Sequence, residues 1–183
     1  MKKIFGLVAS LTVISAACAG VLAFIKNMTQ GPIEKTAMEK KLSAARLVMP
    51  DGVEFVEPVA WADAEKKNPI DFAGKNNAGE VVGYAVTGIS PNGYGGNITI
   101  MVGFMRDKKT VVCYKSLSHA ETSGLGSKLS SDEFSSQFNG KSCEDIKVVK
   151  DGGKIEAITS ATITSRAVCE AVGNAQKKLA AAE

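Results

Sequence analysis

The first hydrophobic pattern along the chain is an uncharged run from Ile4 to Ile25, rich in Val, Leu, Ile, Ala and Phe. As an α-helix rising about 1.5 Å per residue, the run is long enough to cross a bilayer core of about 30 Å. Lys2 and Lys3 precede it, and the positive-inside rule puts such a flank in the cytoplasm. The pattern predicts a single transmembrane helix over residues 1–27 of an inner-membrane protein, with the rest of the chain on the extracytoplasmic side.

Two other interpretations of this N-terminal run stay open. A cleaved signal peptide has an apolar core of about 7–15 residues followed by small residues, and Ser15, Ala16 and Ala17 could form its cleavage site, although this run is longer. A lipoprotein signal would use Cys18 as the lipidated residue, but Ser15 lies where Leu is usual. The length of the run favours a retained anchor.

A helical pattern resumes after a short polar break at Met28–Gly31. Pro32 suits the first position of a helix, and good helix formers follow from Ile33 to Met49. The Pro50–Gly52 segment ends this pattern with a turn signal. We expect residues 28–50 to form a helical stalk.

Between Val53 and Ser118 the pattern changes to runs of β-branched and aromatic residues, which are typical of strands. Turn residues at Asn76–Gly79 and at 106–109 separate the runs. Short turns join antiparallel strands, so we expect an antiparallel sheet and not a series of βαβ units. The predicted strands are Glu80–Ile89, Ile98–Met105 and Thr110–Leu117.

The last part of the chain is mainly helical in pattern. Ser130–Phe138 predicts a short helix capped by Ser130 or Ser131, and Ile146–Val149 predicts one more strand. Arg166–Ala182 predicts a terminal helix whose apolar face would carry Ile163, Ala167, Ala171, Ala175 and Leu179. The expected fold is α+β: a transmembrane helix, the stalk, and a domain over residues 51–183 whose antiparallel sheet is covered by the terminal helix.

Composition and charge narrow the functional classes. The 183 residues carry a net charge of only +3, with no basic patch that would suit nucleic acid. The four cysteines form no CxxC pair, so an iron–sulfur cluster or a zinc site is not indicated. Three cysteines follow the predicted anchor: Cys113, Cys143 and Cys169. They could form one disulfide with a thiol left over, or all three could be buried and unpaired. Burial is favoured, above all for Cys169.

Candidate chemistry begins at Glu156–Ser165, where hydroxyl side chains cluster at the start of the terminal helix. Ser160 or Thr159 is a candidate N-cap, and Thr162 would then fall in the first turn. Unpaired N–H groups and the positive end of the helix dipole suit that turn to a phosphate. A Ser/Thr-rich cap without a ligand would give the same pattern.

The run from Thr159 to Ser165, with Glu156 three residues earlier, resembles the flavinylation motif of FMN-binding domains. The family pattern is an acidic residue, two variable positions, Ser or Thr, Gly, Ala and Thr. The resemblance implies that FMN is joined through its phosphate to the hydroxyl of Thr162, with Thr159, Ser160 and Ala161 beside it. Glu156 stands where the family has Asp, and Ser160 where it has Gly.

Two further segments resemble loops of the same family. Gly93–Gly96 is similar to a Gly-Tyr-Gly-Gly loop beside the flavin, although a plain hairpin tip would look alike. His119–Gly126 is similar to the pattern His-x-Glu-Thr-Pro-Gly-Leu-Gly, with Ser123 in place of Pro. A single His makes no metal site, and no metal is expected. The resemblance implies flavin contacts from Tyr94, Glu121, Thr122 and Gly126.

The whole chain resembles the G subunit of the Rnf electron-transport complex, and is related to the C subunit of the Na⁺-translocating NADH:quinone reductase, which is usually longer. The resemblance implies an electron-relay component of a membrane-bound ferredoxin:NAD oxidoreductase coupled to ion transport, carrying covalent FMN. It implies as partners the other subunits of the complex and a flavin transferase, and no catalytic residue or complete activity in this chain alone. The alternatives are a membrane-tethered interaction domain without a cofactor and a flavin sensor.

Overall fold

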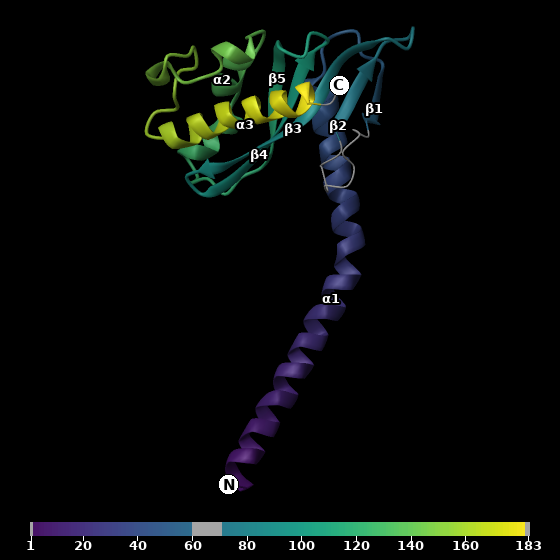
Figure 1. The fold of residues 1–183 in the computed structure, drawn as a ribbon, viewed down its shortest axis with the longest axis vertical. Coiled ribbons are helices and arrows are strands. Elements are labelled where there is room, and N and C mark those ends of the chain that lie inside the picture. The colour runs from purple at the N-terminus through teal and green to yellow at the C-terminus, as the bar shows by residue number, and fades with distance from the viewer. Residues whose placement is uncertain (1, 60–70, 182–183) are drawn as a thin grey trace. The chain divides into compact units, whose positions relative to one another are not determined.

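The computed structural model describes residues 2–59 and 71–181 of the chain. The contacts divide it into two compact units, Met1–Glu39 and Lys40–Glu183. Figure 1 follows the chain from the N-terminal helix to the C-terminal one.

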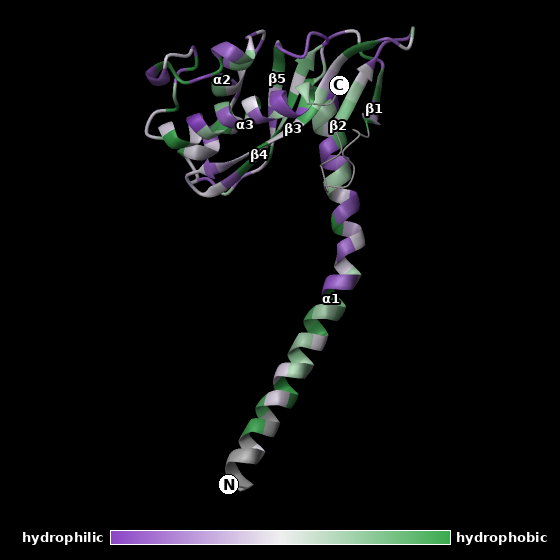
Figure 2. Cartoon of the chain, viewed as in Figure 1, coloured by the Kyte–Doolittle hydropathy of each residue, from purple (hydrophilic) through white to green (hydrophobic). Residues whose placement is uncertain are grey.

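The N-terminal unit is helical and belongs to helix α1 (Lys2–Val48). Figure 2 shows that its first half is hydrophobic in composition. Among the described residues, this is the one helix long and apolar enough to cross a membrane, and its most apolar stretch is unburied. The length and polarity of the helix agree with the anchor that the sequence predicts.

The break expected at Met28–Gly31 is wrong, because α1 continues through it with Pro32 inside the helix. Pro32 removes one backbone hydrogen bond, but local side chains add others. The Thr29 hydroxyl donates to the Ile25 carbonyl at 2.9 Å, and Gln30 donates to Glu34 at 3.0 Å, one turn on across the proline. The Gln30–Glu34 pair is an i, i+4 side-chain contact that supports helical backbone where composition indicated a break.

The second unit is built on a five-stranded antiparallel sheet in the order β1-β2-β3-β4-β5. Its strands are β1 (Phe55–Val59), β2 (Asp71–Lys75), β3 (Val81–Gly93), β4 (Gly96–Met105) and β5 (Val111–Ser118). The three runs predicted from β-branched and aromatic residues are therefore confirmed as strands, and both predicted turns join neighbouring strands. β3 and β4 are the longest pair and end together at a hairpin, which we call the β3–β4 tip (residues 90–97).

One face of the sheet is covered by helix α3 (Thr162–Ala180), which lies across β3 and β4 (Figure 1). Val86, Ile100 and Val102 form a buried cluster with α3 residues such as Val168 and Leu179, all at 0% exposure. Fully burying one such side chain contributes about 1.5–3 kcal/mol. The packing of α3 on the sheet therefore contributes strongly to the stability of the domain.

Close approach of α3 to the sheet depends on Gly88 of β3. A Cβ atom there would overlap the backbone oxygen of Ala171 and lie 3.1 Å from the Ala175 side chain. The predicted face of α3 is right at Ala167, Ala171, Ala175 and Leu179 but wrong at Ile163, which is 50% exposed. Ile163 lies in the first turn of the helix, where α3 has only begun to cross the sheet.

The other face of the sheet receives the last turns of α1, which belong to this second unit. Ala45 and Val48 are fully buried there, as are Ala85 and Met101 of the sheet. A Cβ atom on Gly103 would overlap the Val48 carbonyl, so the helix end lies directly on β4. The segment predicted as a stalk thus ends inside the core of the domain.

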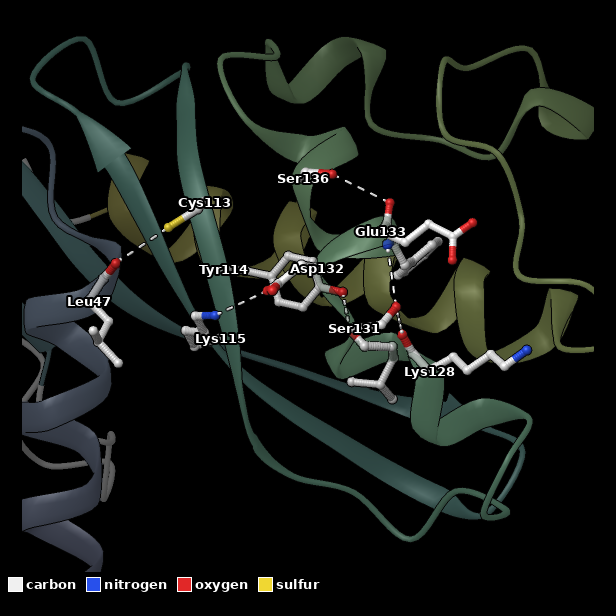
Figure 3. A network of polar contacts seen from close by, with 11 residues as sticks. Leu47, Cys113, Tyr114, Lys115, Lys128, Ser131, Asp132, Glu133 and Ser136 are labelled. Carbon is white, nitrogen blue, oxygen red and sulfur yellow. Dashed lines mark hydrogen bonds and ion pairs between the residues drawn. The ribbon is translucent and has the colours of Figure 1, made fainter.

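Between β5 and α3 the chain forms short helices, η1 (Gly126–Ser130), α2 (Asp132–Ser135), η2 (Ser136–Phe138), η3 (Cys143–Asp145) and η4 (Val149–Asp151). Figure 3 shows how the first of them are held on β5: the Tyr114 hydroxyl donates to the Leu129 carbonyl, and the Ser131 hydroxyl caps α2 by accepting from the Phe134 N–H. Phe138 packs edge-on against Tyr114 at 4.9 Å. The short helix predicted over Ser130–Phe138 is confirmed as α2 followed by η2, with Ser131 as its cap.

The strand predicted at Ile146–Val149 is wrong. Only an isolated parallel bridge joins Val148 to Ile155 in this region, and η4 begins at Val149. Gly152 has a left-handed φ of 82°, and a Cβ on Gly153 would overlap the Lys147 backbone. The chain therefore turns back on itself too sharply for a strand to extend.

The four cysteines are all described, and all are unpaired thiols. Cys169 is buried under α3 as expected, and burial raises the pKa of its thiol to about 12. A thiol with such a pKa stays protonated and unreactive at neutral pH.

Candidate functional site

The start of α3 differs from the predicted cap. The N-cap residue is Ala161 and no side chain caps the helix, so neither Thr159 nor Ser160 does so. A capping side chain requires extended backbone at its own residue, whereas Ser160 has a left-handed φ of 62°. Thr162 is the first helical residue, within the first turn as expected. The N–H groups of this turn are left without a side-chain acceptor.

Inside the turn, two hydroxyls are occupied by the fold itself. The Ser165 hydroxyl accepts from the Ile158 N–H at 2.9 Å and donates to the Ala161 carbonyl at 3.0 Å, which ties the preceding loop to the helix. The Thr164 hydroxyl donates to the Glu121 carboxylate. Both residues are buried, whereas Thr162 is half-buried and lines a cavity.

This cavity has a volume of about 500 Å³ and lies between the start of α3, the β3–β4 tip and a loop over residues 118–128, which we call the His119 loop. It brings together seven of the eight predicted site residues: Tyr94, Glu121, Thr122, Gly126, Ser160, Ala161 and Thr162. Thr159 lies elsewhere, in a small hollow beside Phe134 and Glu156. These segments are far apart in the sequence, and it is the fold that brings them together around the cavity.

Glu121 connects the three walls of the cavity. One carboxylate oxygen, Oε1, accepts from the Gly95 N–H at 3.0 Å, and the other, Oε2, accepts from the Thr164 hydroxyl. The Glu121 N–H in turn donates to His119 Nδ1 at 3.3 Å. A Cβ atom on Gly126 would lie 2.5 Å from Oε2, so glycine at 126 makes room for the carboxylate.

The remaining walls are apolar and exposed. Tyr94 is 72% exposed, Leu125 44% and Ile163 50%. Leu125, Ile163 and Thr164 were not predicted as site residues. The sequence alone does not show that a Leu or an Ile will line a cavity. Thr164 and Glu121 are far apart in the sequence, so no local pattern predicts their hydrogen bond.

A larger cavity of about 770 Å³ lies along the opposite side of α3, beyond Ile163. It is lined by Asp151 and Arg166, which form a two-bond ion pair with both distances 2.7 Å. The Arg166 hydrogen bonds hold the pKa of Asp151 below its ordinary value. We place the candidate site in the smaller cavity because that one contains a hydroxyl at an uncapped helix N-terminus.

Comparison with known proteins identifies the family of this chain. Residues 93–177 match the FMN-binding domain family, a span that begins in the β3–β4 tip and includes the His119 loop and the start of α3. The G subunit of the ion-translocating oxidoreductase complex of Methanosarcina acetivorans is 32% identical, over 100% of this chain and 97% of that protein. This chain belongs to the G-subunit family of ion-translocating oxidoreductase complexes.

Other members of the family are similar over most of their length. The G subunit of the Na⁺-translocating ferredoxin:NAD⁺ oxidoreductase complex of Acetobacterium woodii is 35% identical, over 93% of this chain and 89% of that protein. Among solved structures, the C subunit of the Na⁺-translocating NADH-quinone reductase of Parabacteroides distasonis shares the fold, with a TM-score of 0.51, 19% identity, and coverage of 69% of this chain and 76% of that one. The second unit thus shares the fold of this C subunit and contains the segment that matches the FMN-binding domain family.

Proposed function

We propose that this chain is the electron-relay component of an Rnf-type ferredoxin:NAD oxidoreductase coupled to ion transport, and that it carries FMN as a phosphoester on Thr162. The observation that carries the proposal is the cavity that joins the Thr162 hydroxyl to the β3–β4 tip and the His119 loop. Membership of the G-subunit family supports the complex, and the FMN-binding domain match supports the cofactor.

The start of α3 suits the phosphate end of FMN. A helix N-terminus carries a positive partial charge and unpaired N–H groups, and α3 begins with no side-chain cap to occupy them. The Thr162 hydroxyl lies at the same place, half-buried. A phosphoester at Thr162 would therefore lie against the N–H groups of the first turn, as phosphates do at other helix N-termini.

The rest of the cavity suits the isoalloxazine ring. Ligand pockets have volumes of about 300–1,000 Å³ and mainly apolar walls with a few polar groups, and this cavity of about 500 Å³ has Tyr94, Leu125 and Ile163 as apolar walls. When bound, FMN supplies a ring that accepts two electrons and releases them singly. The chain itself binds the ring, orients it and keeps it at the membrane.

The position relative to the membrane follows from the anchor. Lys2 and Lys3 precede the apolar helix, and the positive-inside rule supports our proposal that the FMN-binding domain lies on the extracytoplasmic side. A phosphoester would keep FMN from being lost there, and the anchor would hold it near the integral subunits of the complex. A protease added to intact cells should remove an exported domain and leave a cytoplasmic one whole.

The decisive experiment compares the wild-type chain with Thr162→Ala, after expression with a flavin transferase in a host that exports the domain. We expect the wild type to be yellow and heavier by FMN less one water, and the variant to be colourless and unmodified. Intact-mass spectrometry and visible absorption provide both readouts.

Two matched variants refine this test. Thr162→Ser keeps a hydroxyl and should retain modification, whereas Ser136→Ala removes an exposed hydroxyl outside both the cavity and the motif and should leave modification intact. An unmodified, colourless wild type would overturn the proposal and favour a cofactor-free interaction domain. A flavin that is present but exchanges no electrons with the partner subunits would favour a sensor.

A further inference from the structure

The β3–β4 tip has the composition of a flexible loop, with Gly93, Gly95 and Gly96 around Tyr94. Its hydrogen bonds nevertheless fix the tip in one position. Two carboxylates from separate parts of the chain, Glu121 of the His119 loop and Glu170 of α3, hold it at two points.

The first point is the end of the tip. Glu121 accepts from the Gly95 N–H at 3.0 Å with one oxygen and from the buried Thr164 hydroxyl with the other, so a single side chain links the tip to the first turn of α3. A Cβ atom on Gly95 would overlap the Ala120 carbonyl, and one on Gly93 would lie 2.7 Å from Glu121 Oε1. Glycine at positions 93 and 95 therefore allows the tip to lie in close contact with the His119 loop, in addition to giving the backbone conformational freedom.

The second point is the base of the tip. Glu170 Oε2 accepts from the fully buried Ser90 hydroxyl at 2.6 Å, and both Glu170 oxygens accept from the Asn92 amide, at 2.9 and 3.1 Å. The Asn92 N–H donates to the same Ser90 hydroxyl at 3.2 Å. One turn further along α3, Asn174 donates to the Ile89 carbonyl at 3.0 Å. The pairing of β3 with β4 is irregular between Ser90 and Gly93, and these bonds supply the support that the ladder lacks there.

We propose that Glu121 and Glu170 are positioning residues that fix the β3–β4 tip, with Tyr94, as a preformed wall of the cavity beside Thr162. Both oxygens of each carboxylate accept hydrogen bonds from the protein, so the role we assign to Glu121 is to hold Gly95 and Thr164 in place around the ligand. This inference rests on the proposed function only for the identity of the ligand, because the hydrogen bonds of Glu121 and Glu170 are all formed within the protein.

The test measures amide hydrogen exchange in residues 90–97 of the full-length, flavin-free chain in detergent. Glu121→Ala and Glu170→Ala should each raise exchange in this segment by about ten- to a hundredfold, because each removes hydrogen bonds to a charged acceptor. Glu121→Gln keeps an acceptor for Gly95 and a partner for Thr164, and should restore most of the protection. Glu156→Ala is the matched control, because Glu156 lies outside the cavity and bonds to Gln137 through its backbone.

A second variant covers the case in which Glu121→Ala fails to fold. Thr164→Val removes one hydroxyl at nearly constant volume and should also raise exchange at the tip, whereas Thr164→Ser should not. In flavin-loaded protein, Glu121→Ala and Glu170→Ala should weaken the visible circular dichroism of the bound flavin, because a loosened wall holds the ring less rigidly.

The outcomes separate this inference from the proposed function. Faster exchange at the tip in a chain that never acquires FMN would support the positioning residues and overturn the flavin proposal. Flavin on Thr162 with unchanged exchange in all three bond-breaking variants would overturn the positioning role and leave the flavin proposal standing.

Discussion

At the scale of single residues, the most informative position is Ser160. It is one of two described non-glycine residues with positive φ, at 62°, and it directly precedes the uncapped start of α3. Left-handed backbone costs a non-glycine residue about 1–2 kcal/mol. The family motif has Gly at this position, so the backbone geometry explains the motif: only glycine adopts this turn without strain.

Ser160→Gly should therefore stabilise the domain by about 1 kcal/mol and speed attachment of FMN, because the turn that presents Thr162 would form without strain. Lys108→Gly is the matched control, since Lys108 has a φ of 58° in a distant hairpin turn. It should change stability without changing the rate of attachment. Urea denaturation and a time course of intact mass measure the two effects, and equal attachment rates for wild type and Ser160→Gly would contradict the prediction.

At the residue level, the motifs selected side chains that the fold brings together. A hydroxyl such as Thr162 within a specific motif is recognisable in any context, and seven of the eight predicted residues do line one cavity. Prediction failed for Thr159 and for the cap at Ser160, because both depend on a backbone angle that Ser and Thr do not specify. The pairing of Thr164 with Glu121 arises only from tertiary packing, so no local pattern indicates it.

At the scale of elements, α3 couples the core to the site. The helix packs on the sheet through small residues at Gly88 and Ala171, and its first residue is Thr162. A displacement of the helix body would therefore displace the site at its end. Gly88 sets the distance between α3 and the sheet.

Gly88→Ala should destabilise the domain by about 1–3 kcal/mol and lower FMN attachment, since the new methyl group overlaps the Ala171 carbonyl and backbone cannot rotate away. Gly173→Ala makes the same chemical change within α3, where a Cβ would meet nothing within 4 Å. That control should be neutral or stabilise by up to about 1 kcal/mol, because Ala is the better helix former. Thermal or urea unfolding compares the pair, and a neutral Gly88→Ala would show that α3 tolerates a shift.

Element-level prediction was sound for runs with a clear period and wrong at their ends. Strands β3, β4 and β5 were predicted from runs of β-branched and aromatic residues, and most of the buried face of α3 from four-residue spacing, whereas β1 and β2 were not predicted as separate strands. The continuity of α1 through Pro32 could not be predicted, because composition does not reveal the Gln30–Glu34 hydrogen bond that spans the proline. The strand expected at Ile146–Val149 had suitable residues but found no partner strand.

At the scale of the whole molecule, carboxylates tie α3 to the rest of the domain. Hydrogen bonds from Ser90 and Asn92 hold the pKa of Glu170 below its ordinary value of 4.5, and hydrogen bonds from Arg166 hold that of Asp151 below 3.8. A carboxyl whose pKa is lower in the folded state stabilises the fold above its unfolded pKa. That contribution is lost as the pH falls through the folded value.

The domain should therefore lose stability as the pH falls below about 4.5, and a Glu170→Gln, Asp151→Asn double variant should lose less. The wild type should exceed the variant in unfolding midpoint at about pH 6, and the gap should close towards about pH 3. Urea unfolding of the full-length chain at several pH values measures this gap. A gap of constant size across this range would mean that these two carboxylates do not produce the acid sensitivity.

The position of α3 after the strands and loops of the cavity has a consequence for maturation. Every strand and loop that borders the cavity precedes α3 in the sequence, and the strands form a simple meander whose neighbours are adjacent along the chain. Such a sheet can assemble progressively with little loop-closure cost, yet the cavity does not exist until α3, which follows the sheet in the sequence, has docked. Attachment of FMN at Thr162 would then report a finished fold, so an incompletely synthesised or misfolded chain would remain without its cofactor.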